Sequence, residues 1–346
     1  MSTRAGTKAG TAALMLADLL LLAACAPSAR PADPGARAAA TGAGHVLEVV
    51  VANQQSASAS IRLDDGSMKH VAVGTGPHEA AVSPDGRTAV VTIYGTREPG
   101  SQLAVIDLVR DSVIKVIDLG RFTRPHGAVF LGGSSERVAV TSESTNTVVL
   151  VNLATGALDS VPTNARASHM IAVTADGRRG WTANIADHSV SELDLAQRRF
   201  VRSITVPERP EGIAVTPDGA EVWVGSNTTG AVSVISTRDW AVTHTLAGAT
   251  FPYRLGASPD GATMAVVDQQ GGQLLVADVA GHTYRGSIAL ASPRGVVVDA
   301  DGRTAYVTLA AGSVAAVDLV TLGVLWTAAV QASPDGVGAG RRATAR

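Results

Sequence analysis

The stretch Arg209–Ala249, RPEGIAVTPDGAEVWVGSNTTGAVSVISTRDWAVTHTLAGA, decides the fold. It contains four short runs rich in Val, Ile and Ala with partial period-two alternation, and Gly, Pro and Asp stand between the runs. This pattern is typical of strands joined by tight turns. We therefore predict four strands in this stretch, at Glu211–Thr216, Glu221–Ser226, Ala231–Ser236 and Ala241–Leu246.

The same unit recurs along the chain. The copies share a P-x-G-hydrophobic start, an (S/T/A)-x-D-G turn and a V-x-V-x-D-L run, and they lie at Gly76–Gly120, Arg124–Asn164, Ala167–Glu208, Phe251–Ala291 and Ser292–Val330. A period of about forty residues with four strands per unit is typical of a β-propeller blade. Because one blade cannot bury both of its faces, the blades must stack around a central axis.

The two ends of the repeat region are incomplete in complementary ways. His45–Val73 aligns with the last three strands of a unit, and Ser333–Gly340 aligns with the first strand. Joined in space, the two segments complete a seventh blade and leave no free sheet edge. We therefore predict an all-β, seven-bladed propeller whose first blade is closed by the C-terminal strand. The alternative is a loose C-terminal tail beside an incomplete first blade.

Residues 1–25 are predicted to be a targeting segment. Arg4 and Lys8 precede the short apolar run Thr11–Ala24, which is too short to span a bilayer comfortably. The string Leu22-Ala23-Ala24-Cys25 resembles the bacterial lipobox, and this resemblance implies a lipid anchor on Cys25, with the propeller on the extracytoplasmic side. An ordinary cleaved signal and an uncleaved anchor are the alternatives.

The remaining boundaries follow from composition. Residues 26–44 are predicted to be a disordered linker of Pro, Ala and Gly. Residues 45–340 are predicted to form the propeller, and residues 341–346 a solvated basic tail. The 346 residues have a net charge of −2, so bulk charge does not favour a nucleic-acid partner. The single cysteine excludes an intramolecular disulfide and a C-x-x-C-H haem attachment site. The sequence also has no P-loop and no G-x-S-x-G motif.

The first strand of every blade should begin at one mouth of the central tunnel. The residue after the recurring proline position is polar in all seven copies. The next residue is charged in two copies, where it is Glu79 and Arg254. We expect these side chains to converge although they are distant in sequence. The candidate ligand-binding residues are His78, Glu79, His126, His169, Glu211, Tyr253, Arg254, Arg294 and Asp335.

Three interpretations of this set stay open, and no catalytic residue is assigned. His78, His126 and His169 could bind a divalent metal together with a nearby carboxylate. A histidine could instead act as a general base, with Arg254 or Arg294 fixing an anionic group. The third interpretation is a polar rim around a water-filled tunnel or a small ligand, and it predicts no cofactor.

The loops that follow the second strands belong to the same mouth and are rich in amides. They contain Asn53, Gln54, Gln55, Tyr94, Arg97, Glu98, Glu143, Asn146, Asn184, Asp187, His188, Asn227, Asp268, Gln269 and Gln270. The amides and His188 suit hydrogen bonding to a polar ligand or a partner protein, whereas most of the Asn and Asp residues are expected to be turn formers. The recurrent Asp107, Asn152, Asp194, Asp278 and Asp318 are predicted to cap hairpin turns through their side chains.

The run Pro210–Gly219, with Tyr306-Val307-Thr308 in a later copy, resembles the YVTN-type β-propeller repeat. Relatives of this kind include binding propellers, surface-layer proteins, lactonase-like propellers, and haem d1 and quinoprotein amine dehydrogenase propellers. The fold does not transmit one function among them. We therefore expect a monomeric, lipid-anchored binding or scaffold module of the bacterial envelope, periplasmic in a Gram-negative cell. Its partner would be a small polar ligand or an envelope protein, and a lactonase-like hydrolase is the alternative.

Overall fold

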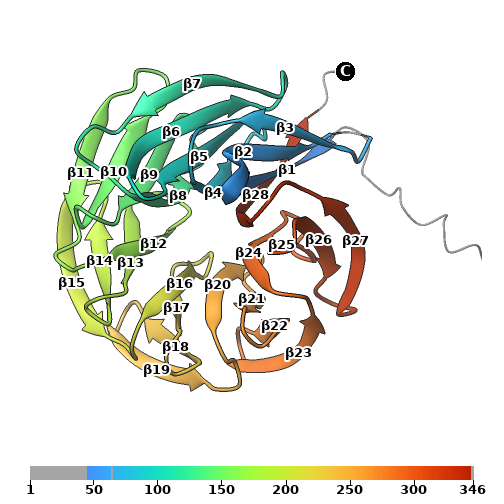
Figure 1. Cartoon of the computed structure of the whole chain (residues 1–346). Helices are drawn as coiled ribbons and strands as arrows, with labels where there is room; N and C mark the ends of the chain where they lie inside the picture. Colours follow the sequence, from blue (N-terminus) through green and yellow to red (C-terminus); the bar gives the residue numbers. More distant parts are fainter. Residues whose placement is uncertain (1–44, 64, 344–346) are drawn as a thin grey trace, which may run out of the picture. The chain divides into compact units, whose positions relative to one another are not determined.

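A computed structural model describes residues 45–63 and 65–343. These described residues belong to one compact unit. The predicted signal segment 1–25 with Cys25, and the linker 26–44, lie outside the described residues. The described part consists of seven four-stranded antiparallel sheets (Figure 1). No helix within it has the length and apolar character needed to span a bilayer.

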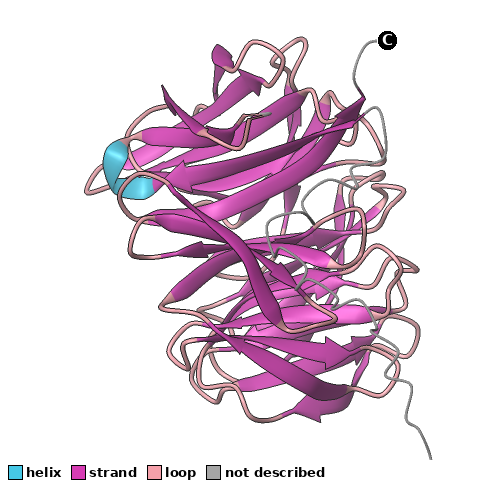
Figure 2. Ribbon diagram, turned by 90° about the vertical axis from the view of Figure 1, so that its right-hand side faces the viewer, coloured by secondary structure: helices cyan, strands magenta, loops and turns pink. Residues whose placement is uncertain are grey.

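The blades are numbered from the N-terminus. Blade 1 contains β28 (Pro334–Ala343), β1 (His45–Asn53), β2 (Ser58–Arg62) and β3 (Met68–Ala72). Blade 2 contains β4 (Pro77–Val82), β5 (Thr88–Gly95), β6 (Pro99–Asp107) and β7 (Ser112–Asp118). Blade 3 contains β8 (Pro125–Phe130), β9 (Arg137–Ser142), β10 (Thr147–Asn152) and β11 (Leu158–Pro162), and blade 4 contains β12 (Ser168–Val173), β13 (Arg179–Asn184), β14 (Ser189–Asp194) and β15 (Arg199–Thr205). Blade 5 contains β16 (Pro210–Val215), β17 (Glu221–Ser226), β18 (Ala231–Ser236) and β19 (Ala241–Leu246). Blade 6 contains β20 (Pro252–Ala257), β21 (Thr263–Asp268), β22 (Gln273–Asp278) and β23 (Thr283–Ala289). Blade 7 contains β24 (Pro293–Val298), β25 (Thr304–Leu309), β26 (Ser313–Asp318) and β27 (Gly323–Ala329). Among the described residues the one helical element is the short 3-10 turn η1 (Gln54–Ser56), drawn cyan in Figure 2.

The blades close into a ring. The innermost strand of each blade packs beside the innermost strand of the next, in the order β4, β8, β12, β16, β20, β24 and β28, and β28 returns to β4 (Figure 1). Each interface buries Val, Ala, Leu and Ile from two neighbouring blades, and Trp181, Trp223 and Tyr306 are the largest fully buried side chains. The predicted seven-bladed propeller is thus confirmed.

Blade 1 is assembled from both ends of the described chain, as the sequence predicts. β28 pairs antiparallel with β1 from His45↔Ala343 to Asn53↔Pro334. The expected boundary at residue 340 is wrong, because β28 continues to Ala343. The first two residues of the predicted basic tail are therefore structural: Arg341 Nε donates to Asp299 at 3.1 Å and Arg342 Nε donates to Glu48 at 2.9 Å. Both carboxylates are nearly fully buried, so they need these positive partners. Residues 344–346 lie outside the described range.

The predicted boundaries in the repeat unit agree closely with the structure. Three strands of blade 5 have the predicted bounds, and the first begins one residue earlier, at Pro210. The capping role predicted for the last polar residue of the third strands is confirmed. For example, Asp107 Oδ1 accepts the amide of Val109 at 2.8 Å, and Asp278 Oδ1 accepts the amide of Gly281 at 2.6 Å. Their carboxylates thus shape turns and are not available for the mouth.

Candidate functional site

A β-bulge positions the candidate residues in every first strand. The ladder between β4 and β5 shifts between Pro77 and Ala80, so His78 and Glu79 together face the single residue Thr92. The same irregularity interrupts the innermost strand of each of the other six blades. An extra residue at a bulge bends the strand and re-aims its side chains. The repeated P-x-x segment therefore turns two residues per blade toward the axis.

Buried threonines of the second strands hold these bulges in place. Thr92 Oγ1 accepts the amide of Glu79 at 3.0 Å, Thr141 Oγ1 accepts that of Gly127 at 2.8 Å, and Thr308 Oγ1 accepts that of Gly295 at 2.7 Å. Each threonine is fully buried. Because a bulge leaves backbone groups without a ladder partner, these hydroxyls remove the cost of burying them.

Three histidines from adjacent blades lie against one another in the mouth, with ring planes tilted by 46° and 38°. The ring centroids of His78 and His126 are 4.0 Å apart, and those of His126 and His169 are 3.5 Å apart. The ring of Tyr94 stands edge-on to His126 with centroids 5.6 Å apart. Burial, followed by the neighbouring histidines and Arg254, holds the pKa of His126 well below its ordinary value of 6.5. His126 is therefore a neutral imidazole at pH 7.

Arg254 spans the mouth from blade 6. Its Nη2 donates to Glu79 Oε1 on blade 2 at 2.8 Å, and its Nη1 donates to Glu211 Oε1 on blade 5 at 3.1 Å. Burial raises the pKa of Glu211, but hydrogen bonding to His169, and the charges of His169 and Arg254, lower it to about 2. Arg254 thus serves two carboxylates and is not free to fix an anionic substrate.

His169 is held between two carboxylates. Its Nε2 lies 3.2 Å from Glu211 Oε1, and its Nδ1 lies 3.6 Å from Glu143 Oε2. Burial lowers the pKa of His169, but the two glutamates outweigh burial and raise it above its ordinary value. Glu143 also accepts the hydroxyl proton of Tyr94 at 2.8 Å. His169 therefore has a structural ion-pair role that its neighbour His126 lacks.

Several buried polar atoms of the mouth lack a hydrogen-bond partner among the described residues. They are both ring nitrogens of His126, Nδ1 of His78, Nδ1 of His169 and Oδ1 of Asp335. Asp335 is nearly fully buried, and its Oδ2 lies 3.4 Å from Nδ1 of His78. Buried polar atoms in native proteins are rarely left unpaired, so each such atom calls for a water, an ion or a ligand.

One triplet has the spacing of a metal site. His78, Glu79 and His126 each offer a ligand atom, and these atoms all lie within 4.8 Å of one another. Among the described residues this is the one group of His, Cys, Asp or Glu with that spacing. The predicted metal set of His78, His126 and His169 is thus brought together only in part, because Glu79 takes the place of His169 in the triplet.

Comparisons with known proteins show the fold alone. No family model and no curated protein matches this sequence. The fold matches 1787 chains of solved structures, so it is too widespread to indicate one function. Among them is a structure titled Kuenenia stuttgartiensis Hydrazine Synthase, at a TM-score of 0.67 and 17% identity, which covers 82% of this chain and 92% of that chain.

The two other candidates lie beside the central cluster. The ring of Tyr253 packs under the guanidinium of Arg254, 4.1 Å from its carbon to the ring centroid. Arg294 instead donates to Ser333 Oγ at 3.2 Å. The fold therefore joins eight of the nine predicted candidates by direct contacts. His78, His126, His169, Glu211, Arg254 and Glu79 form a chain of contacts, Asp335 contacts His78, and Tyr253 contacts Arg254.

The sequence underrated three residues of the mouth and missed one. Tyr94, Glu143 and Asn227 were predicted to lie in the loops of the mouth but were not among the candidate ligand-binding residues. In the structure Tyr94 and Glu143 support the histidines and Asn227 donates to Glu211. Arg124 was not expected at all. Its one signal in the sequence is its place just before Pro125, where an Arg also precedes Pro210.

Arg124 borders a depression of about 440 Å³ that adjoins the mouth. Tyr94 is its common wall with the histidines, and the other polar lining residues are Gln54, Gln55, Thr75 and Thr96. The guanidinium of Arg124 lies over the Tyr94 ring at 4.7 Å and donates to the carbonyls of Thr96 at 2.8 Å and Arg97 at 3.3 Å. Because these acceptors are neutral, the positive charge of Arg124 is oriented without being cancelled.

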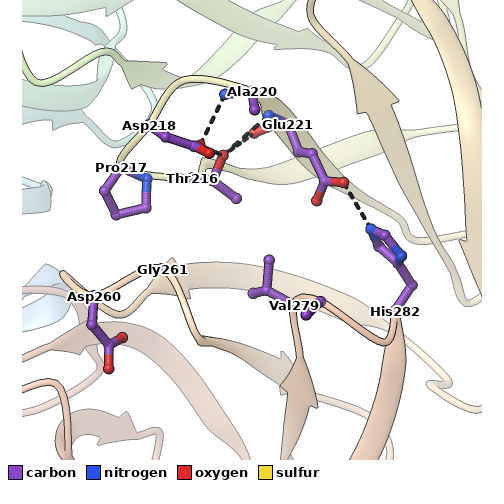
Figure 3. Close-up of a pocket in the computed structure, with 10 residues that line it drawn as sticks. Thr216, Pro217, Asp218, Ala220, Glu221, Asp260, Gly261, Val279 and His282 are labelled. Atoms are coloured by element: carbon purple, nitrogen blue, oxygen red, sulfur yellow. Dashed lines mark hydrogen bonds and ion pairs between the residues drawn. The ribbon is translucent and has the colours of Figure 1, made fainter.

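A second depression, of about 430 Å³, lies between blades 5 and 6, among the turns at the opposite ends of the innermost strands. Figure 3 shows Glu221 of β17 and His282 of the β22–β23 turn facing each other there. Glu221 accepts from His282 Nε2 at 2.8 Å and from Trp223 Nε1 at 3.0 Å, and Asp218 Oδ1 accepts the amide of Ala220 at 3.0 Å. These carboxylates already have partners, and none of the predicted site residues lines this depression.

Proposed function

We propose that this protein is a ligand-binding β-propeller of the bacterial envelope, anchored to a membrane through an acylated Cys25, with its binding site at the tunnel mouth. The observation that carries the proposal is the state of His126. Its side chain is completely buried, yet neither ring nitrogen has a partner among the described residues. A scaffold that needed only a filled axis would be more stable with apolar side chains there.

The depression beside Tyr94 favours a small anionic ligand. Arg124 is the charged residue among those that line it, and the amides of Gln54 and Gln55 and the hydroxyls of Thr75 and Thr96 add hydrogen-bonding groups. A volume of about 440 Å³ lies within the range usual for small-molecule sites. The resemblance to YVTN-type repeats supports a binding role, since binding propellers are among the relatives of that kind.

Replacing Arg124 by alanine is expected to weaken this binding strongly. A panel of small mono- and dicarboxylates and inorganic phosphate would be titrated by calorimetry, in chelator-treated buffer so that no metal takes part. We expect at least one member of the panel to bind the wild type, and the Arg124→Ala variant to bind it at least about 10-fold more weakly, since a charged hydrogen bond is worth about 1.5–3 kcal/mol.

The matched control is Arg121→Ala, because Arg121 lies over Phe122 and is not among the residues that line the depression. This variant should bind like the wild type. If no member of the panel binds, or if both variants lose affinity equally, the anionic ligand class is wrong. A hydrolase of lactones or small esters stays the alternative, and turnover of a lactone panel that is lost in His126→Ala would favour it.

The anchor has a separate test. Replacing Cys25 by serine removes the thiol that would carry the lipid, so the protein should move from the membrane fraction to the soluble fraction of the expressing cell. Mass spectrometry of the wild-type N-terminal peptide should show a diacylglyceryl adduct on Cys25. An unmodified Cys25, or equal fractionation of the two proteins, would contradict lipidation.

A further inference from the structure

We propose that the tunnel mouth binds a divalent transition-metal ion, with His78, Glu79 and His126 as its protein ligands. This inference deepens the proposed function, on which it rests, because it states what occupies the gap at His126. The ligands come from two neighbouring blades, since His78 and Glu79 belong to the bulge of β4 and His126 to the bulge of β8.

The spacing of the triplet is close to that of a bound ion. Its three ligand atoms lie within 4.8 Å of one another. Bonds of about 2.0–2.2 Å in a tetrahedral site put neighbouring ligand atoms about 3.3 Å apart. The two sets of distances differ by an amount that side-chain rotation can supply, without movement of the blades. The bulges hold the backbone of these residues in place while the rings adjust.

The charge of the mouth also favours a cation. The connected side chains include four carboxylates, from Glu79, Glu143, Glu211 and Asp335, whereas Arg254 is the one guanidinium among them. All of these groups are buried or half-buried, so solvent compensates the excess negative charge only weakly. A divalent ion would reduce this excess at the place where the unpartnered nitrogens lie.

The surrounding residues resemble the outer partners of a metal site. Ligands in such sites are usually oriented by hydrogen bonds from further groups. Arg254 orients Glu79 with two donors, at 2.8 and 3.1 Å to Oε1. Asp335 lies 3.4 Å from Nδ1 of His78. Two imidazoles with carboxylates suit Zn²⁺, Fe²⁺, Co²⁺ or Ni²⁺ better than Ca²⁺ or Mg²⁺, which prefer oxygen ligands.

His169 is less suited as a ligand than His126, because its Nε2 is already paired with Glu211 and its Nδ1 lies near Glu143. Both of its ring nitrogens face glutamates, Nε2 at 3.2 Å from Glu211 and Nδ1 at 3.6 Å from Glu143. A ligand set of three histidines would have to break these contacts. The ligand set with Glu79 leaves these contacts intact. It also predicts that metal affinity depends on His126 and not on its neighbour His169.

The test uses the full chain, stripped of metal by a chelator and then titrated with Zn²⁺ and, separately, with Co²⁺. We expect one ion per chain with a Kd below about 1 μM, and several degrees of thermal stabilisation by Zn²⁺. Bound Co²⁺ should give the intense visible absorption of a four- or five-coordinate ion. His126→Ala and His78→Ala should each weaken binding at least 100-fold, and Asp335→Asn about 10-fold.

The matched controls are two histidines outside the triplet. His169→Gln removes a mouth histidine that is not a ligand, and it should change the affinity by less than about 10-fold. His244→Ala removes a ring that stacks on His282, 3.8 Å between centroids, at a distant surface where a metal could bind without specificity. Unfolding midpoints in chelator would show which apo variants remain folded, and the Co²⁺ spectrum of the wild type needs no variant.

Three outcomes would overturn the inference: no ion bound by the wild type, equal affinity in His126→Ala, or binding that is lost in His244→Ala instead. Each of them would leave water or a ligand without metal as the partner of the unpaired nitrogens of the mouth. None of these outcomes would affect the binding of small anions, because that binding is measured without metal and depends on Arg124. The two proposals can therefore fail separately.

Discussion

Replacing Gly336 by alanine is expected to destabilise the protein by at least about 3 kcal/mol, because no space exists for the added methyl group. Gly336 lies in β28, the strand that closes blade 1 against blade 2. A Cβ built on it would lie 2.4 Å from Glu79 Oε2, 2.5 Å from Glu79 Cα and 2.7 Å from the carbonyl oxygen of His78. The last two are backbone atoms, so relief requires blade 1 and blade 2 to separate.

Chemical denaturation monitored by circular dichroism would measure this effect. The matched control is Gly323→Ala in β27, where a Cβ would meet nothing closer than 3.8 Å and the backbone is not left-handed. That change should leave the midpoint unchanged or raise it slightly, since alanine loses less conformational entropy on folding than glycine. A Gly336→Ala protein as stable as the wild type would mean that the two ends of the ring do not meet as described.

The same glycine shows why the sequence predicted the fold so well. Four of the seven units have a glycine at the third position of their start, where the next blade comes close, as at Gly212 and Gly295, whose Cβ atoms would lie 2.8 Å and 2.3 Å from backbone oxygens of the following blade. The repeat is therefore visible in the sequence partly because these copies have to satisfy the same contact, whereas Glu79, Met170 and Arg254 occupy the position in the other three. Turn residues repeat for the same reason, as the capping bonds of Asp107 and Asp278 show.

The sequence predicts where the mouth lies, but it does not predict which side chains of the mouth pair with one another. Aligning the repeats places His78, His126 and His169 side by side, and their rings are indeed in contact, with planes tilted by 46° and 38°. The alignment gives no information on length or rotamer, so it could not show that Arg254 crosses the axis to Glu79. It also could not show that both ring nitrogens of His126 lack a partner among the described residues while Nε2 of His169 pairs with Glu211.

The C-terminal boundary was missed for a related reason. Arg341 and Arg342 follow a glycine-rich segment and look like a solvated tail in the sequence. Their partners, Asp299 and Glu48, are remote in the chain, and β-pairing with β1 brings them into reach. Local composition cannot reveal a charge that is needed by a carboxylate buried elsewhere in the ring.

Replacing Arg254 by methionine is expected to cost about 3–5 kcal/mol at pH 7, which is typical when one partner of a buried ion pair is removed. The arginine side chain is only 4% exposed, and its removal leaves Glu79 and Glu211 without their shared guanidinium. Methionine fills much of the volume, so the loss is mainly one of charge compensation. The measurement is denaturant unfolding in chelator, so that no bound metal contributes. Arg238→Met, at a side chain 90% exposed and paired with Asp239, should stay within about 0.5 kcal/mol.

The dependence of this loss on pH separates the charge effect from lost packing. In the wild type the pKa of Glu211 is lowered from 4.5 to about 2, so its ionisation stabilises the fold above pH 4.5 and this contribution is lost as the pH falls toward 2. Without Arg254 the charge and hydrogen bonds of the guanidinium no longer lower the pKa of Glu211, and His169 alone opposes the effect of burial. The variant therefore loses part of this contribution at neutral pH. The difference in stability between the two proteins should therefore be largest at pH 7 and should narrow as the pH falls from 4.5 toward 2. A difference that is the same at pH 3 and pH 7 would mean that Arg254 contributes through packing, and that the carboxylates of the mouth are compensated by other groups.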